Sequence, residues 1–407
     1  MYKIIFVALF SVLIGCNQKQ GEMVVSSPIV VSGTQPGNGP YFTKDHLGNP
    51  VLCWTAGEKN QEQLYYAVYN NEAENFNEAI AVPSIGISCS PETMNKVVFK
   101  NDGTVIAVFA RKHPTDQNKF AGALLYTQSF DGGKSWTTEK FLHSDSLPGN
   151  SRSYFDLALL PDGEVGAVWL DGRLKKGKDG SALFFAKTKG NEGFLSDKPI
   201  AETVCQCCRT DIYVDAKEKV HVLYRDIDNS IKGQVRDFAH IVSSDNGDTF
   251  STSNKISDDN WVVDGCPHTG ASITSNQEKI EIVWFTAGGT PGLYYTRSTN
   301  NDSIFEPRQL ITENGRHPQM TSLGTWSVIA YQESTTIQEQ THADHGAHGN
   351  KVNHDNVVLM LKEDGVSINK VTIENEGEYP VLCSLNTEEL LIAYTKEQKV
   401  IVKKVKI

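Results

Sequence analysis

The sequence lacks two features that would each have pointed to a class of function. It has no apolar run of the roughly twenty residues that a bilayer-spanning helix needs; the apolar stretch Ile4–Ile14 is much shorter. It also has no excess of positive charge, because 38 Lys and Arg residues stand against 49 Asp and Glu residues, for a net charge of −11. Since nucleic-acid binding depends on neutralising phosphates with Lys and Arg, this balance argues against a nucleic-acid partner.

The N-terminal segment resembles the export signal of a bacterial lipoprotein. Its short apolar stretch ends in Leu13-Ile-Gly-Cys16, which is similar to a lipobox. The resemblance implies that residues 1–15 are a signal peptide, that Cys16 is lipidated and that residues 16–23 form a tether. Asn17, rather than Asp, after the cysteine favours the outer membrane over the inner membrane. The alternative is an ordinary secretory signal that happens to contain a cysteine.

An apolar run that ends in an aromatic residue recurs seven times along the chain. The closing aromatics are Trp54, Phe109, Trp169, Tyr224, Trp284, Tyr331 and Tyr394. Their spacing is close to that of kelch and WD arrays, which predicts one four-stranded antiparallel sheet per repeat, arranged radially as a β-propeller. We therefore expect a single all-β domain over residues 24–407, with seven blades, or six if one weak repeat is an excursion.

The two ends of the repeat array predict how the ring closes. Each repeat is expected to supply an inner strand, the aromatic-ended strand, a third strand and a short outer strand. The last repeat stops after its third strand, Val400–Lys406, while Val24–Val31 has no partner in its own repeat. Pairing this N-terminal segment as the fourth strand of the last blade would close the ring and remove two exposed edges.

Two predicted turns between third and fourth strands resemble the Asp-box, or BNR repeat, of the sialidase superfamily. In such a turn the Asp side chain accepts backbone N–H bonds, Gly supplies a positive φ, and an aromatic residue wedges between sheets. The matching positions are Ser129, Asp131, Gly133 and Trp136 in the first turn, and Ser243, Asp245, Gly247 and Phe250 in the second. The resemblance implies the fold rather than the chemistry, because in the family these turns lie away from the active face.

The resemblance also implies one possible activity, hydrolysis of a glycoside of an anionic sugar. Sialidases have an Arg-Ile-Pro element in the first blade, three arginines that bind a carboxylate, a Tyr–Glu nucleophile pair and an acidic Asp. This sequence has no Arg-Ile-Pro element, and its first blade has no arginine. A clamp for an anion could instead use charged residues expected at the loops of one face. These candidates are Arg152, Asp171, Arg173, Arg209, Arg225, Asp226, Arg236 and Arg316. We favour the alternative that Asp171–Arg173 and Arg225–Asp226 are inter-blade ion pairs.

Five of the eight cysteines are predicted to meet at one mouth of the axial channel. In a propeller, the loop that enters an inner strand lies on the same face as the loop between second and third strands. Cys89, the run Cys205–Cys208 and the segment Cys266–His268 each precede an inner strand. If the run is extended, Cys205 and Cys207 point to one side and Cys208 to the other, so at most two of the three can readily share a site with Cys266 or His268. The other mature cysteines, Cys53 and Cys383, are expected in the core.

The same face should carry a His-rich insertion in the sixth repeat. A short His-rich tract suggests metal binding, and thiolates with imidazoles suit copper or zinc, copper being favoured. The candidate ligands are Cys205, Cys207, Cys208, Cys266, His268, His342, His345 and His348. Two alternatives stay open. Cysteines of an exported protein often form disulfides, here Cys208–Cys266, and the His tract is equally compatible with a solvated loop.

The sequence therefore predicts a lipid-anchored extracytoplasmic propeller that binds a transition metal at its loop face. The alternatives are a sialidase-like hydrolase and an interaction scaffold in which disulfides staple the blades. The expected partners are the membrane, through the anchor, and a small ligand, glycan or protein at the loop face.

Overall fold

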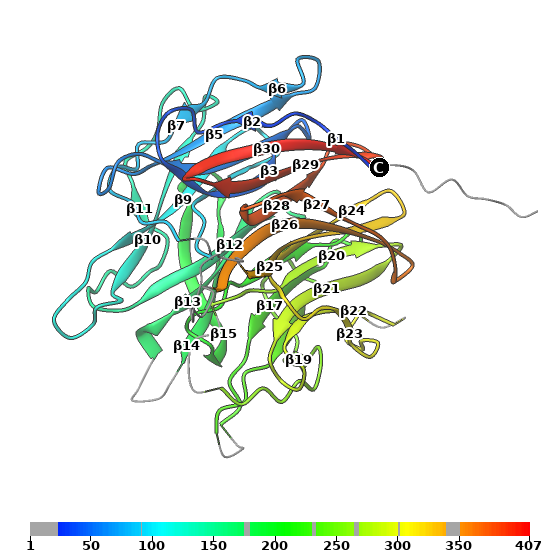
Figure 1. Ribbon diagram of the computed structural model, residues 1–407. Helices are drawn as coiled ribbons and strands as arrows, with labels where there is room; N and C mark the ends of the chain where they lie inside the picture. The colour runs from blue at the N-terminus through cyan, green and yellow to red at the C-terminus, as the bar shows by residue number, and fades with distance from the viewer. Residues whose placement is uncertain are drawn as a thin grey trace, which may run out of the picture.

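The computed structural model describes residues 23–90, 92–174, 180–229, 233–263, 268–299, 302–338 and 351–407. They form seven antiparallel sheets arranged around one axis as a β-propeller (Figure 1). The expected all-β fold with seven blades is confirmed. Within the same residues no helix has the length and apolar character needed to cross a membrane.

The blades follow one another in chain order, and each runs outward from the axis. Blade 1 is made of β3 (Gly37–Lys44), β4 (Pro50–Ala56), β5 (Gln63–Asn70), β6 (Asn75–Phe76) and β7 (Ile80–Ala81). Blade 2 is made of β8 (Lys96–Phe99), β9 (Val105–Lys112), β10 (Gly122–Ser129) and β11 (Lys140–Phe141). Blade 3 is made of β12 (Arg152–Leu159), β13 (Val165–Asp171), β14 (Ser181–Thr188) and β15 (Phe194–Val204). Blade 4 is made of β16 (Asp211–Val214), β17 (Val220–Arg225), β18 (Phe238–Ser243) and β19 (Asn254–Lys255). Blade 5 is made of β20 (Ser272–Asn276), β21 (Lys279–Thr286), β22 (Gly292–Arg297) and β23 (Gln309–Thr312).

The last two blades differ from the others in length and in composition. Blade 6 is β24 (Gly315–Leu323), β25 (Trp326–Gln338), β26 (Lys351–Glu363) and β27 (Val366–Glu374), and blade 7 is β28 (Glu378–Ser384), β29 (Glu389–Lys396) and β30 (Lys399–Lys406), completed by β1 (Val24–Val25) and β2 (Ile29–Val30). The N-terminal strands lie beside β30 in Figure 1, with Val24 opposite Lys406 and Ile29 opposite Val402. The predicted closure of the ring is therefore confirmed.

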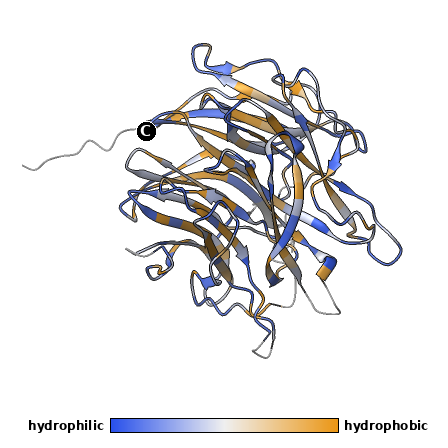
Figure 2. Cartoon of the chain, turned by 180° about the vertical axis from the view of Figure 1, so that it is seen from behind, coloured by the Kyte–Doolittle hydropathy of each residue, from blue (hydrophilic) through white to orange (hydrophobic). Residues whose placement is uncertain are grey.

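Burial between neighbouring blades holds the sheets in place. All residues of β4 and β13 are buried, because each second strand is covered on both faces by adjacent blades. One apolar cluster, for example, joins Val108 of blade 2 to Trp169 of blade 3. Figure 2 shows that hydrophobic residues follow the strands, whereas many loops are hydrophilic.

Polar side chains link the inner strands of successive blades. Asp156 accepts the backbone N–H of Ile212 at 3.0 Å, and Asp211 accepts that of Ile273 at 3.1 Å. One blade further, the Ser272 hydroxyl accepts a third such bond. These bonds satisfy backbone donors that face a neighbouring blade rather than a strand of their own sheet.

In every blade, one residue of the inner strand pairs with the residue of the second strand that comes just before the closing aromatic. These inner-strand residues occupy the same structural position in all seven blades. We call these seven residues the channel ring: Tyr41, Lys96, Asp156, Asp211, Ser272, Gln319 and Val381. Two residues earlier lies a second equivalent set, the mouth ring: Gly39, Met94, Tyr154, Arg209, Gly270, His317 and Tyr379. In blades 1, 3, 6 and 7 a register irregularity separates the start of the inner strand from the channel ring. In those four blades the mouth-ring residue has a left-handed backbone, with φ between 52° and 59°.

Both Asp-box turns have the expected geometry. In the first, Asp131 Oδ1 accepts the Ser135 N–H at 2.9 Å, and hydrogen bonds from Ser135 hold the pKa of Asp131 at about 2. The aromatic Trp136 lies edge-on to Tyr66 of blade 1, so it packs between two blades. In the second turn, Phe250 contacts Phe185 of blade 3 in the same way.

A buried histidine pair in blade 4 links folding to pH. His221 and His240 stack at 5.1 Å between ring centroids, and a hydrogen bond of 2.9 Å joins Nδ1 of His221 to Nε2 of His240. Both rings are almost fully buried. Burial lowers the pKa of His240 to about 3, with a further contribution from His221, and burial lowers the pKa of His221 despite the nearby Asp215.

We predict that the His240→Leu variant tolerates acid better than the wild type, relative to its own stability at pH 7.5. The folded wild type keeps His240 neutral, whereas the unfolded chain protonates it below about pH 6.5, so this stability is present above pH 6.5 and is lost as the pH falls toward 3. At pH 4 the variant should lose about 3 kcal/mol less than the wild type in urea unfolding. The exposed His113→Leu serves as control, and equal pH dependence in all three proteins would contradict the prediction.

Candidate functional site

Three cysteine thiols converge in the loop that leads from β15 of blade 3 to β16 of blade 4. Residues 205–208 form a turn, which begins where the Cys205 N–H donates to the Arg225 carbonyl. The Cys205 sulfur lies 3.5 Å from that of Cys207 and 3.7 Å from that of Cys208, and all three sulfurs lie within 4.8 Å of one another. The run turns instead of extending, so the condition under which two of these sulfurs would point to one side and the third to the other is not met.

Two arginines reach this group of sulfurs, which we call the thiol site. Arg236 Nη1 lies 3.4 Å from Cys205 Sγ, and Arg225 Nε lies 3.3 Å from Cys208 Sγ. The Arg225 guanidinium also donates to the carbonyls of Arg236 and Phe285, which ties the site to blade 5. The three cysteines are only 1–3 % exposed.

The surroundings divide the three thiols into one acidic and two weakly acidic groups. Hydrogen bonds from Cys207 and Cys208, together with the charge of Arg236, lower the pKa of Cys205. The pKa of Cys207 is raised because its thiol donates to Cys205, and burial raises the pKa of Cys208. Cys205 is therefore the most acidic of the three thiols.

The other predicted metal ligands fall into two groups. Cys266, His342, His345 and His348 lie outside the described residues, as does Cys16. His268 is described and exposed, but it is not among the groups that converge with the three sulfurs. Cys89 is half-buried apart from them, with its thiol near the Ser90 and Thr93 carbonyls. Cys53 and Cys383 are buried in the core, as expected.

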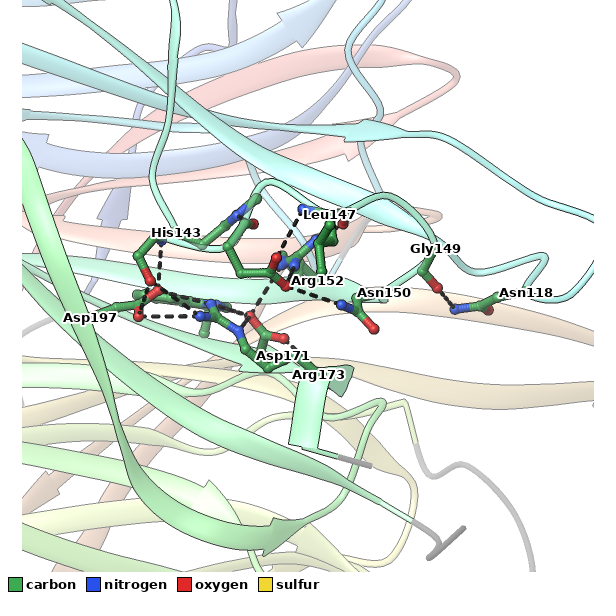
Figure 3. Close-up of polar contacts among 12 residues, drawn as sticks. Asn118, His143, Leu147, Gly149, Asn150, Arg152, Asp171, Arg173 and Asp197 are labelled. Carbon is green, nitrogen blue, oxygen red and sulfur yellow. Dashed lines mark hydrogen bonds and ion pairs between the residues drawn. The ribbon is translucent and has the colours of Figure 1, made fainter. Parts of the chain in front are cut away.

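The arginines proposed as an anion clamp are largely engaged by protein groups (Figure 3). Arg152 pairs with Asp145 at 2.6 Å and with Asp171 at 3.2 Å. Arg173 pairs with Asp171 at 2.7 Å and with Asp197 at 2.8 Å. The Asp171–Arg173 pair therefore exists, but it lies within blade 3 and does not join two blades as expected.

The prediction of an ion pair between Arg225 and Asp226 was wrong. Arg225 turns inward to the thiol site and to backbone carbonyls, where its guanidinium stacks 4.0 Å from the ring centroid of Phe238. Asp226 instead closes a backbone bridge to Val204, the last residue of β15. Arg316 is exposed and lies 4.9 Å from the Phe285 ring centroid. Among the arginines proposed for the anion clamp, Arg316 thus has the most exposed side chain, and it lies next to His317 of the mouth ring.

The two channel carboxylates also differ from the pair that a glycoside hydrolase uses. Asp156 lies within hydrogen-bond reach of Asp211, and burial together with Asp156 raises the pKa of Asp211 to about 7. Glycosidase carboxylates usually stand about 5–9.5 Å apart across the scissile bond. Because both aspartates also accept backbone N–H bonds from the next blade, their main role is structural.

A polar group at the mouth ring was missed by the sequence reasoning. Glu92, in the loop before β8, lies over the mouth ring and contacts Arg209, Gly270 and His317, which belong to blades 4, 5 and 6. The Tyr379 ring of blade 7 lies 4.5 Å from that of His317. We call Glu92, Arg209, His317 and Tyr379 the axial mouth. Aligning the repeats places His317 and Arg209 on this face, but a loop residue such as Glu92 has no repeat position.

No family model matches the chain, and no curated protein matches its sequence. Solved structures do match. A protein of unknown function from Dyadobacter fermentans is 14% identical with a TM-score of 0.53, covering 95% of this chain and 99% of that chain. The polysaccharide lyase Uly1 is 10% identical with a TM-score of 0.53, covering 91% and 89% of the two chains. A PL25 ulvan lyase is 11% identical with a TM-score of 0.51, covering 93% of each. Sialidases are also among the neighbours.

At these identities the likeness concerns the fold alone. Together with the strand pairing, it defines the class of fold as a seven-bladed β-propeller.

We predict that Asp171 stabilises blade 3 rather than acting on a ligand. Its carboxylate is fully buried and accepts bonds from Arg152, Arg173 and the Trp169 indole. Asp171→Asn should lower the free energy of unfolding by about 3 kcal/mol, because it removes the buried carboxylate that Arg152 and Arg173 share and leaves each arginine with one counter-charge, Asp145 or Asp197. In the control, Asp116→Asn, which breaks an exposed pair with Lys119, should change it by less than about 0.5 kcal/mol. An unchanged urea midpoint in Asp171→Asn would show that this network contributes little.

Proposed function

We propose that the protein is a metal-binding propeller that holds one soft transition-metal ion, copper(I) in preference to zinc(II), at Cys205, Cys207 and Cys208. The observation that carries the proposal is the convergence of three buried sulfurs in one turn. Thiolates are the ligands that select copper(I) and zinc over harder ions.

The spacing of the sulfurs supports a shared ion. Three sulfurs that bind one metal at about 2.3 Å stand about 3.8–4.0 Å apart in tetrahedral or trigonal geometry. The sulfur–sulfur distances of 3.5 Å and 3.7 Å from Cys205 need only a small expansion of the turn. Because the segment is a loop rather than part of a sheet, that expansion breaks no strand pairing.

The charges near the sulfurs favour a monovalent ion. Three thiolates carry three negative charges, and Arg225 and Arg236 bring two positive charges within 3.4 Å of the sulfurs. A copper(I) ion supplies the third positive charge, whereas zinc(II) leaves a surplus positive charge in a buried site. An uncompensated buried charge is costly, so neutrality favours copper(I).

The cellular location that we propose for the protein is inferred from its sequence. A lipidated Cys16 would tether the propeller to the cell envelope, at the outer membrane in preference to the inner membrane. Cys266, which precedes β20 of blade 5, is the remaining sequence candidate for a fourth ligand, and the His342–His348 tract is a candidate for loading the site. Binding of the ion would also protect these thiols from disulfide formation in an oxidising compartment.

The glycan-directed alternative stands second. The fold likeness to polysaccharide lyases supports an extracytoplasmic activity on an acidic polysaccharide only weakly, because fold does not fix function. The arginines that would have formed its anion clamp bind carboxylates, carbonyls and thiols of the protein itself.

We predict that the reduced protein, purified without oxygen, binds one copper(I) per chain in competition with a chromophoric copper(I) chelator. Cys207→Ser should weaken binding at least 100-fold, because it removes a ligand, whereas Cys89→Ser should leave it unchanged. Copper bound equally well by the Cys205→Ser/Cys207→Ser/Cys208→Ser variant would contradict the proposal. Complete oxidation of the three cysteines in protein isolated from cells would favour the disulfide alternative instead.

The charge argument makes a separate prediction for Arg236→Gln. Removing this positive charge should weaken copper(I) binding by about 10–100-fold, the usual effect of a group beside the ligands. Zinc(II) binding should fall less or rise, because zinc(II) leaves a surplus positive charge in the wild type. A parallel loss for both ions would show that Arg236 acts through structure and not through charge.

A further inference from the structure

The axial mouth contains a histidine whose ring is oriented by a buried carboxylate. Glu92 Oε1 lies 2.6 Å from Nδ1 of His317, while its Oε2 accepts the Gly270 N–H at 2.9 Å and lies 3.6 Å from Arg209. Glu92 is 7% exposed and His317 is 12% exposed. Groups from blades 2, 4, 5 and 6 thus fix one imidazole at the end of the channel.

The charge state of Glu92 decides which ring nitrogen of His317 is available. Burial alone would raise the pKa of Glu92, but Arg209, His317 and the Gly270 N–H together lower it, so the group is a carboxylate. A carboxylate only accepts hydrogen bonds, and therefore Nδ1 carries the proton. In the neutral ring Nε2 then presents a lone pair, and no described residue hydrogen-bonds to it.

Tyr379 packs against this imidazole and carries a phenol that can donate a hydrogen bond. Its ring lies 4.5 Å from that of His317, and burial, with contributions from Glu378 and Glu92, raises its pKa, so the phenol stays protonated at neutral pH. Both residues have a left-handed backbone, with φ of 53°. For residues other than glycine such a conformation costs about 1–3 kcal/mol and clusters at functional sites.

A small hollow lies between these side chains and the channel ring. Its wall includes Met94, Arg209, His317, Gln319, Tyr379 and Val381. It is large enough for about one water molecule and has polar partners on one side. The wall carries no Ser, Thr or Cys, so water is the nucleophile that this site can hold.

We propose that the axial mouth is a hydrolytic site for small acyl esters, in which His317 activates a water molecule and the Tyr379 hydroxyl binds the oxyanion. Water attacks the ester carbonyl carbon, and its proton passes to Nε2 of His317. The tetrahedral intermediate then expels the alkoxide, which takes the proton from Nε2. The products are a carboxylic acid and an alcohol, and the imidazole returns to its starting state. Glu92 is a positioning residue, because it acts through the ring of His317.

The size of the hollow sets the expected substrate preference. Because the hollow holds only about one water molecule, the acyl group of a substrate would lie at its opening, near Met94 and Val381, and we expect the smallest group, acetyl, to be preferred. The site shares no residue with the thiol site, so it does not depend on metal binding. Failure of one proposal leaves the other standing.

The test uses 4-nitrophenyl acetate with the full chain and its variants. His317→Gln should lower kcat/KM at least about 100-fold, the usual contribution of a positioned general base. Tyr379→Phe should lower kcat with little change in KM, and 4-nitrophenyl octanoate should be a far poorer substrate. His113→Gln, in an exposed position, should retain full activity.

Glu92→Gln separates a positioning role from a structural one. It should lower kcat and change the rising limb of the pH–rate profile, which a loss of folded protein would not do, and Glu92→Asp should restore part of the rate. Circular dichroism checks that each variant is folded. Full ester turnover in a folded His317→Gln variant, or wild-type turnover no faster than that of free imidazole at the same concentration, would overturn the proposal.

Discussion

Closure of the ring by the N-terminal strands is the constraint on which the rest of the structure depends. When β1 and β2 pair with β30, the first and last blades become neighbours and no sheet edge stays open between them. The seven inner strands then share one register around the axis. That register brings residues far apart in sequence, such as Glu92 and His317, to the same end of the channel. Both candidate sites are consequences of this closure, because each draws on loops that enter inner strands.

Buried arginines hold different parts of this face in different ways. In blade 3, Arg152 and Arg173 are neutralised by Asp145, Asp171 and Asp197, which makes a rigid network with little charge left for a ligand. In blade 4, Arg225 instead contacts a sulfur and backbone carbonyls, so its charge acts on the thiol site. The same residue type therefore serves stability in one blade and, as we propose, metal selectivity in the next.

Repeat spacing was sufficient to predict the fold. Each blade must bury its second strand between two neighbouring blades, so each repeat carries the same apolar run that ends in an aromatic residue. The third strands, the closing strand from Val24 and both Asp-box turns follow from that pattern. The details of the loops did not follow. The turn at Cys205–Cys208 depends on a hydrogen bond to the distant Arg225 carbonyl, and the inward position of Arg225 depends on the Phe285 carbonyl of blade 5. Neither contact leaves a signal in the local sequence, so the turn was not foreseen and the Arg225–Asp226 pair was predicted wrongly.

We propose that three sulfurs in a turn of the loop face bind one metal ion. X-ray absorption at the copper edge, on protein loaded with one equivalent of copper(I), tests this most directly. We expect a first shell of three sulfur atoms at about 2.3 Å, reduced to two sulfurs in the Cys207→Ser variant. A first shell of nitrogen or oxygen alone, or a spectrum identical in the wild type and the variant, would contradict the account.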